Sequence, residues 1–409
     1  MPRSLFAVSV NLFSLLAPLA DDEKLAAIGA NTGSEIKTDR AFPSVSTSAS
    51  ARAFKAILSM LFSAGGSSCA GLTRLKSPHK KKAGNAMSRF LMFVGLLFWA
   101  TAGAAQDFPV TVDHAFGQTT VAERPLRVAS VGWANHEVPL AFGIVPVGMA
   151  RASWGDDDGD GMLPWVTEKL DELGGETPIL FDEGDGVDFE AVAATNPDVI
   201  LAAYSGISQA DYETLSRIAP VIAFPEAAWT TTWREMIRQN AAGLGMAEQG
   251  DALVADIEQR IKTAIADYPQ LSGKTGIFVT HLDVRDLSTI GFYAAADQRV
   301  QFLHDLGMAT PQAVKDASEA GKYSGRVSAE RIDMFDDVDV VVTYGDQARL
   351  DELAKNPLVA RFSAIARGSV ILLANDPMGT AANPTPLSID YVLDDYLGRL
   401  AAAVAKAEK

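Results

Sequence analysis

Aromatic and arginine side chains near the predicted ends of strands are the residues of this sequence best suited to chemistry. Indole and phenol rings offer wide, rigid contact surfaces, and guanidinium groups pair with carboxylate, catecholate or hydroxamate oxygens. Ligands of open α/β sheets gather at the carboxyl ends of strands, so this set predicts a ligand cleft rather than a reaction centre. The candidate ligand-binding residues are Trp133, Arg151, Trp154, Tyr204, Trp229, Arg285, Tyr293, Tyr323 and Arg326.

Motifs for catalysis or metal binding are scarce after residue 105. That part contains no G-x-S-x-G nucleophile elbow, and its four histidines show neither H-x-x-x-H nor H-E-x-x-H spacing. No G-x-G-x-x-G follows a strand, so a dinucleotide enzyme would lack its phosphate cradle. The only cysteine, Cys69, lies upstream, which excludes disulfides, Cys-ligated zinc and thiol catalysis. We expect neither an enzyme nor a resident cofactor or metal.

The acidic stretch at residues 156–161 begins like a calcium loop, with carboxylates at its first, third and fifth positions and glycine at its sixth. Position twelve is Thr167, where a bidentate glutamate is required, and Pro164 interrupts the loop. We interpret the stretch as a solvated turn.

From Pro125 onward, short β-branched runs alternate with amphipathic helical stretches, a pattern typical of βα units around parallel strands. The predicted strands are Arg127–Val131, Val145–Ala150, Asp198–Ala203, Pro220–Phe224, Thr275–His281, Val338–Thr343 and Ser369–Leu373. The fold class is therefore α/β, with two sheets, one in each of two lobes. Trp233, at the start of a predicted helix, is assigned to packing.

A weak internal repeat supports the division into two lobes. Residues 189–206 read as a helix, an acidic turn, a buried strand, tyrosine and glycine, and residues 329–345 repeat that order. Between them, Ala247–Tyr268 carries apolar residues at helical spacing, without proline. At 1.5 Å per residue this helix would reach about 33 Å, so we expect a single rigid connection between the lobes.

Charge is distributed unevenly along the chain. The whole chain carries −16, and since its first 105 residues hold 12 Lys and Arg against 5 Asp and Glu, the remainder carries −23. A surface of this sign repels phosphate backbones, so nucleic acid is not an expected partner.

The N-terminal region has the pattern of an export signal. Residues 87–105 combine a basic start at Arg89, an apolar run from Phe90 to Ala100 and small residues up to Ala105, which predicts a cleavable secretory signal. Residues 1–86 precede this complete signal, and we interpret them as a disordered or mis-started extension. A second pattern, ending at Cys69, is like a lipoprotein signal except that Gly66 stands where leucine is usual. The expected compartment is the periplasm.

Several segments together resemble a known family. They are Pro125–Ser130, Asp188–Leu201, Leu215–Val221, Val327–Ile332 and Pro386–Asp395. Residues 108–405 resemble the iron-siderophore substrate-binding proteins of ABC importers, a class that includes the ferric-hydroxamate and vitamin B12 receptors. The resemblance implies two Rossmann-like lobes with mainly parallel sheets, joined by one long α-helix, and a shallow cleft that closes little. The domains would be residues 106–245, a connecting helix at 246–270, and residues 271–409.

The resemblance also implies a function and its partners. A monomeric periplasmic protein would bind an Fe(III)-siderophore without a cofactor and deliver it to the ABC permease of the inner membrane. Asp211 and Glu330 match the carboxylates that dock on the permease, and Tyr204 with the Tyr323–Arg326 loop matches ligand-contacting loops. Phe181-Asp182-Glu183 stands where the hydroxamate receptor carries a ligand-binding arginine, which favours a more anionic chelate held by Arg151 with Arg326 or Arg285. Haem or cobalamin as ligand, or an α/β enzyme with an unrecognised site, are the alternatives.

Overall fold

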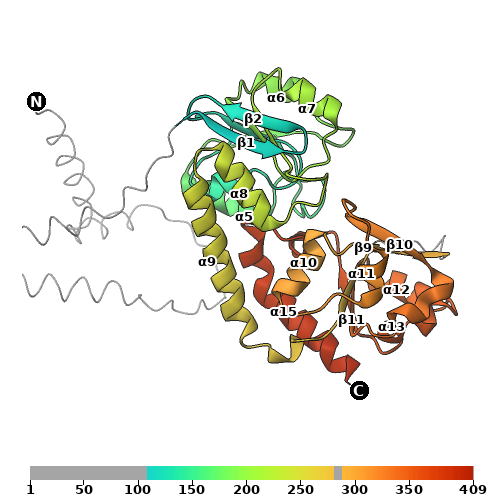
Figure 1. The fold of residues 1–409 in the computed structure, drawn as a ribbon. Coiled ribbons are helices and arrows are strands. Elements are labelled where there is room, and N and C mark those ends of the chain that lie inside the picture. Colours follow the sequence, from blue (N-terminus) through green and yellow to red (C-terminus); the bar gives the residue numbers. More distant parts are fainter. Residues whose placement is uncertain (1–107, 281–287, 409) are drawn as a thin grey trace, which may run out of the picture. The chain divides into compact units, whose positions relative to one another are not determined.

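The computed structural model describes residues 108–280 and 288–408, which form two α/β lobes (Figure 1). Each lobe has its own five-stranded sheet, and one long helix connects them, which confirms the predicted fold class. The predicted signal at 87–105, the extension at 1–86 with Cys69, and Arg285 lie outside the described residues. Within the described ranges, no helix is both long enough and apolar enough to cross a membrane.

The N-terminal lobe is built on a parallel sheet with strand order β5-β4-β3-β6-β7. Its strands are short and largely buried, as expected for a parallel sheet covered on both faces: β3 (Val128–Ser130), β4 (Gly148–Ala150), β5 (Ile179–Phe181), β6 (Val199–Ala202) and β7 (Val221–Ala223). An antiparallel hairpin of β1 (Val110–His114) and β2 (Gly117–Val121) lies beside this sheet. The hairpin and β5 were not predicted, although β1 alternates buried and exposed residues as a half-buried strand does.

Five helices cover the N-terminal sheet, namely α4 (Glu137–Ala141), α5 (Pro164–Leu173), α6 (Phe189–Ala194), α7 (Gln209–Leu215) and α8 (Trp233–Gly243). Capping boxes begin two of them, Ser208 with Asp211 in α7 and Thr232 with Glu235 in α8. Trp233 is fully buried, as predicted, and its indole Nε1 donates to Asp305 Oδ2 at 3.0 Å.

The C-terminal lobe has a mixed sheet with strand order β10-β9-β8-β11-β12. Strands β8 (Gly276–Val279), β11 (Val340–Tyr344) and β12 (Val370–Leu373) are parallel, whereas β9 (Thr289–Tyr293) and β10 (Ser324–Ser328) add an antiparallel edge. Its helices are α10 (Gln298–Asp305), α11 (Gln312–Ala317), α12 (Gln347–Leu353), α13 (Ser363–Ala366) and α14 (Pro377–Ala381), with 3-10 turns η3 (Ala329–Phe335) and η4 (Val359–Arg361).

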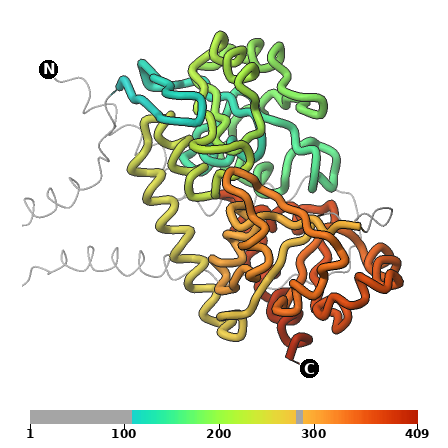
Figure 2. Tube along the Cα trace, turned by 45° about the vertical axis from the view of Figure 1, so that its right-hand side comes forward, coloured from blue at the N-terminus to red at the C-terminus, as the bar shows by residue number. Residues whose placement is uncertain are grey.

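One long helix runs along the side of both lobes (Figure 2). The connecting helix α9 (Ala247–Ile265) has 19 residues and buries Val254, Ile257 and Ile261. It stops short of the predicted Tyr268, because Pro269 disfavours helical backbone in the residue before it and begins the turn η2 (Pro269–Leu271). The final helix, α15 (Ser388–Ala407), packs against α9, and Arg260 of α9 pairs with Asp390 of α15.

The start of α15 is tied to the N-terminal lobe through Glu137, which is fully buried in α4. Its carboxylate accepts from the indole Nε1 of Trp165 at 2.7 Å and from the amide of Leu387 at 2.8 Å. The ring of Trp165 in turn lies 5.1 Å from that of Tyr391. The lobes are therefore held by a second polypeptide segment besides the connecting helix.

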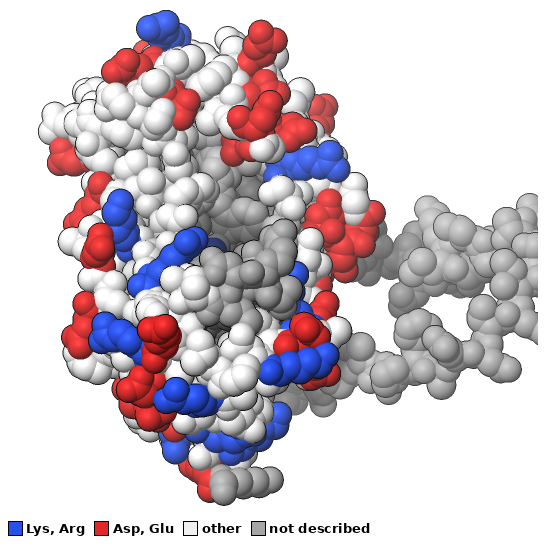
Figure 3. All heavy atoms as spheres, turned by 90° about the vertical axis from the view of Figure 1, so that its right-hand side faces the viewer, with Lys and Arg blue, Asp and Glu red and all other residues white. Residues whose placement is uncertain are grey.

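The acidic turn predicted at residues 156–161 is present. Carboxylate atoms of Asp156, Asp158 and Asp160 lie within 4.8 Å of one another. They bind the turn's own amides, since Asp156 accepts from Gly159 and Gly161 at 2.7 and 2.8 Å. On the face shown in Figure 3, acidic and basic side chains are interspersed over the lower part, and no broad basic patch is visible among the described residues.

Candidate ligand-binding site

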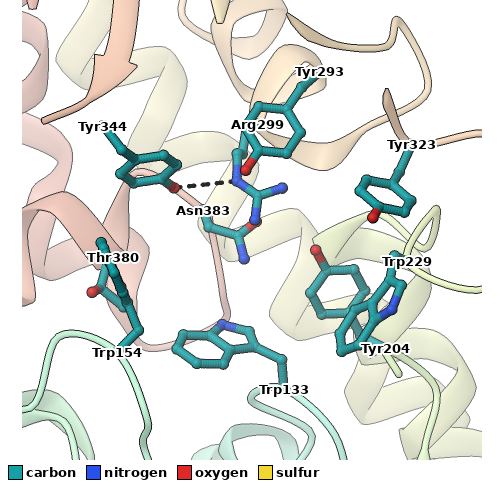
Figure 4. A pocket seen from close by; sticks show the side chains of 10 residues that line it. All are labelled: Trp133, Trp154, Tyr204, Trp229, Tyr293, Arg299, Tyr323, Tyr344, Thr380 and Asn383. Atoms are coloured by element: carbon teal, nitrogen blue, oxygen red, sulfur yellow. Dashed lines mark hydrogen bonds between the residues drawn. The ribbon is translucent and has the colours of Figure 1, made fainter. Parts of the chain in front are cut away.

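A cavity of about 290 Å³ lies between the two lobes and is lined mainly by aromatic side chains (Figure 4). Six of the nine predicted ligand-binding residues line it: Trp133, Trp154, Tyr204, Trp229, Tyr293 and Tyr323. The structure adds four that the sequence analysis missed, Arg299, Tyr344, Thr380 and Asn383. Residues as far as 250 positions apart thus meet in one site, as expected where strand ends of two sheets face each other.

The N-terminal wall is fixed by a buried asparagine. Asn135 Nδ2 donates to the carbonyls of Val131 at 2.8 Å and Tyr204 at 2.9 Å, and its Oδ1 accepts from the Tyr204 amide at 3.0 Å. The Trp133 amide also donates to the Tyr204 carbonyl, at 3.1 Å. These bonds join the segments after β3 and β6, so the two aromatic residues are held at a fixed spacing.

Trp229 completes this wall with an unusual backbone conformation. Its φ of +63° lies in the left-handed region, and its amide donates to the Ser205 carbonyl at 3.1 Å. The indole packs on Gly206, where a β carbon would overlap the indole nitrogen. It meets Tyr204 edge to face, with ring centroids 5.3 Å apart. Gly206 is therefore required for this placement of Trp229.

The C-terminal wall is organised around Arg299, near the start of α10. Its Nη1 donates to the carboxylate of Asp297 at 2.8 and 3.1 Å, and its Nε donates to the hydroxyl of Tyr344 at 3.3 Å. The guanidinium carbon lies 4.1 Å over the ring of Tyr293. Burial alone would lower the pKa of Arg299, but the charge of Asp297 raises it well above its ordinary value, so the guanidinium stays charged.

The net charge of the described residues at the cavity is close to zero. Arg299 is the one cationic residue that lines it among the described residues, and Asp297, which is fully buried behind it, balances its charge. Burial raises the pKa of Tyr204 and of Tyr293, so both phenols keep their protons at neutral pH. Protonated phenols donate and accept hydrogen bonds but are poor metal ligands, which suits a chelate whose metal is already enclosed.

Direct contacts close one side of the cavity. The ring of Trp154 lies 5.9 Å from that of Tyr344, and the amide of Gly155 donates to Asn375 Oδ1 at 2.7 Å. Deeper in the C-terminal lobe, Gln298 Nε2 donates to Asn383 Oδ1 at 2.8 Å. The loop after β4 thus rests directly on the C-terminal lobe.

The two predicted arginines that the structure describes, Arg151 and Arg326, are not brought together. Arg151 lines an adjoining cavity in the N-terminal lobe, with Trp133 and Trp229 as the shared wall. Arg326 is exposed in the edge strand β10 and does not line either cavity, because the predicted ligand loop is part of a strand there. Arg285 lies outside the described residues.

The four lining residues that were not predicted differ in how well the sequence alone could have identified them. Tyr344 belongs to the internal repeat, where it matches Tyr204, and this correspondence could have identified it. Arg299 follows the N-cap Asp297 by two residues at the start of α10, and nothing in the sequence distinguishes it from a surface charge. Thr380 and Asn383 lie in and after α14, without a local signal.

The predicted docking acids lie outside the cavity. Asp211 is committed to the capping box of α7, since its Oδ2 accepts from both the amide and the hydroxyl of Ser208 at 2.8 Å. Glu330 is exposed in the first turn of η3.

Comparisons with known proteins agree with this architecture. The chain is 41% identical to PiaA of Streptococcus pneumoniae TIGR4 in a structure with ferrichrome, which it matches with a TM-score of 0.70 over 73% of this chain and 99% of that one. A periplasmic solute binding protein of Mycobacterium smegmatis is 27% identical, with a TM-score of 0.60 over 72% and 99% of the two chains. The ferric-anguibactin-binding protein FatB of Vibrio anguillarum is 25% identical over 306 residues, 71% of this chain and 87% of that protein.

The family model described as "Periplasmic binding protein" matches residues 128–377, more than half of the chain and most of both lobes. This is a family of binding proteins rather than enzymes, in agreement with the scarcity of catalytic motifs. The chain belongs to the periplasmic binding protein family.

Proposed function

We propose that this protein captures a ferric siderophore outside the inner membrane and delivers it to an ABC importer. The observation that carries the proposal is the aromatic cavity between the lobes, in a chain 41% identical to a protein crystallised with ferrichrome. Aromatic walls cover the organic shell of a chelate, and a cavity of this kind supplies no group that would replace the chelator.

The charge of the cavity favours one ligand class. A ferric trihydroxamate is neutral, whereas a ferric tris-catecholate and ferric citrate are anionic. Arg299 is the one arginine among the described residues that line the cavity, and Asp297 already balances it, so an anionic chelate would lose its hydration without gaining a free cation from them. We therefore propose a neutral ferric hydroxamate, in place of the anionic chelate that the Phe181-Asp182-Glu183 segment favoured.

Calorimetric titration of the full-length protein tests this proposal. The probes are ferrichrome, a ferric tris-catecholate, ferric citrate, haem and cobalamin, with each siderophore also tested free of iron. Saturable binding of ferrichrome, at least about 100-fold tighter than binding of the catecholate, is the expected result. Tighter binding of an anionic chelate would contradict the hydroxamate assignment, and binding of none would contradict the receptor function.

For docking on the permease, the duplicated lobes favour Glu190 rather than Asp211 as the partner of Glu330. Glu190 lies two residues after the cap Asp188 in α6, and Glu330 lies two residues after the cap Ser328 in η3. Each segment leads into the fourth strand of its sheet, β6 or β11. Both side chains are exposed, whereas Asp211 caps its own helix.

Export and oligomeric state complete the proposal. The signal at residues 87–105 would direct the chain to the periplasm, with cleavage after Ala104 or Ala105, and the protein would act as a monomer. N-terminal sequencing of the exported protein tests this route. A mature start at Gln106 or Ala105 is expected, and a start at Cys69 would instead indicate a lipoprotein.

A further inference from the structure

A second cavity of about 500 Å³ adjoins the aromatic one on the N-terminal lobe. It lies at the carboxyl ends of the neighbouring strands β3, β4 and β5, which contribute Gly132, Arg151 and the pair Asp182 and Glu183. Trp133 and Trp229 line both cavities, and Figure 4 shows their indoles at the lower edge of the aromatic one. A ligand in the first cavity could therefore extend past these two rings into the second.

A backbone amide holds the side chain of Glu183 in place. Both of its carboxylate oxygens accept from the amide of Gly132, at 3.0 and 3.2 Å. That amide is the one donor to Glu183 in the described part of the chain, so further acceptor sites on the carboxylate stay open. Burial raises the pKa of Glu183 to about 7, because the charged carboxylate is disfavoured away from water. A nearby positive charge would offset this cost.

The other charged groups of the second cavity leave it acidic. Asp182 is exposed beside Glu183, with one oxygen accepting from the Gly184 amide at 3.0 Å. Arg151 is the single base among the described residues that line this cavity, and it lies near Asp156. Burial would raise the pKa of Asp156, but amide hydrogen bonds and the charge of Arg151 lower it. Arg151 therefore already interacts with a carboxylate.

We propose that this second cavity is a subsite for a positively charged arm of the siderophore, a primary ammonium group carried by a ferric hydroxamate. The inference rests on the proposed function. Glu183 and Asp182 would accept charge-assisted hydrogen bonds from the ammonium, while the indole faces of Trp133 and Trp229 would attract its charge as it passes. The neutral iron-hydroxamate core would stay in the aromatic cavity.

Three derivatives of one chelate test the subsite on the full-length protein. Ferrioxamine B is a linear ferric trihydroxamate with a terminal ammonium; its N-acetyl form is neutral and its N-succinyl form is anionic. The expected order of affinity is ammonium, then acetyl, then succinyl, with about a tenfold preference for the ammonium over the acetyl form. Ferrichrome, which has no ammonium, serves as the reference ligand for the aromatic cavity.

Three variants identify the carboxylates responsible. Glu183→Gln keeps an oxygen for the Gly132 amide, so the fold is preserved, and it should reduce the preference for the ammonium form to about threefold or less. Asp182→Asn should reduce it less, and the double variant should abolish it. The matched control is Asp185→Asn, which removes the same charge from an exposed residue that does not line the cavity and should leave the preference unchanged.

Ferrichrome separates failure of the subsite from failure of the proposed function. If ferrichrome binds but the wild-type protein does not distinguish the three derivatives, or prefers the succinyl form, the subsite proposal is overturned and the receptor function stands. A preference that Asp182→Asn/Glu183→Gln leaves intact overturns it too. If neither ferrichrome nor any derivative binds, the proposed function fails, and the subsite with it.

Discussion

Gly155 and Thr380 touch across the boundary between the lobes, so closely that a β carbon on Gly155 would overlap the Thr380 hydroxyl. Gly155 has φ of +82°, and its amide donates to Asn375, so backbone of the N-terminal lobe lies directly on the C-terminal lobe. The contact lies beside Trp154 and Thr380, which both line the cavity. A side chain at position 155 would therefore change the spacing of the two walls.

Gly155→Ala is expected to weaken ferrichrome binding at least about tenfold, because the loop must leave Thr380 and lose its bond to Asn375. Isothermal titration measures the affinity, and thermal unfolding measures the stability. Gly159→Ala is the matched control, since Gly159 has φ of +85° with nothing within 4 Å of its β-carbon position. It carries the backbone strain alone, about 1 kcal/mol. Equal losses of affinity in the two variants would contradict the role of the contact.

Arg299→Gln is expected to lower both stability and affinity, because it leaves the carboxylate of Asp297 buried without its partner. Breaking a buried ion pair by removing one member costs about 3 kcal/mol. Arg299→Gln/Asp297→Asn removes both charges and should recover much of the free energy of unfolding, measured in urea. Ferrichrome affinity should stay low in both variants, since the cation over Tyr293 is gone. Recovery of affinity together with stability would show that Arg299 acts only through folding.

Glu137 and His136, adjacent and buried, predict opposite responses to pH. Burial raises the pKa of Glu137 from 4.5 to about 7 and lowers the pKa of His136 from 6.5 to about 4. The Glu137 contribution to stability is therefore present below pH 4.5 and is lost as the pH rises to about 7. The His136 contribution is present above pH 6.5 and is lost as the pH falls to about 4.

Glu137→Gln removes the pH-dependent contribution of Glu137 to stability and keeps that of His136. The free energy of unfolding should then fall more steeply on acidification than in the wild type, by an amount on the order of 2 kcal/mol between pH 7 and 4.5. Urea unfolding at four pH values measures it, with the exposed Glu190→Gln as control. In the variant, the new carboxamide at position 137 faces the Leu387 amide and changes the free energy of unfolding by the same amount at every pH. The test is therefore the slope of the free energy of unfolding against pH. Parallel curves of the free energy of unfolding against pH for the variant and the wild type would contradict the raised pKa of Glu137.

The sequence predicted the central strands because β-branched runs such as those around Val199 and Val341 are buried on both faces. It predicted six lining residues because the carboxyl ends of parallel strands converge. The antiparallel strands β9 and β10 were missed, since glycine and serine within them lower strand propensity. Arg299 was missed because its role depends on a buried partner, and burial of Asp297 is a tertiary property that no local pattern reports.

Reversal of charge at Glu190 and Glu330 tests the proposed docking surface. Each glutamate is exposed in the first turn of equivalent segments, α6 and η3, and lies outside the residues that line the cavity. The variant Glu190→Arg/Glu330→Arg should therefore bind ferrichrome within about twofold of wild type. Uptake of radioactive iron from ferrichrome, in cells that express the matching permease, should fall at least about tenfold, because like charges would meet arginines there.

Asp211→Arg is the matched control for this experiment. Asp211 caps α7 through Ser208, so its reversal should cost about 1 kcal/mol of stability and leave uptake near the wild-type rate. Loss of uptake with Asp211→Arg, and its retention with the double glutamate variant, would return the docking role to Asp211. Each single reversal should give an intermediate rate of uptake, because each lobe would meet the permease separately and the remaining glutamate still attracts its arginine.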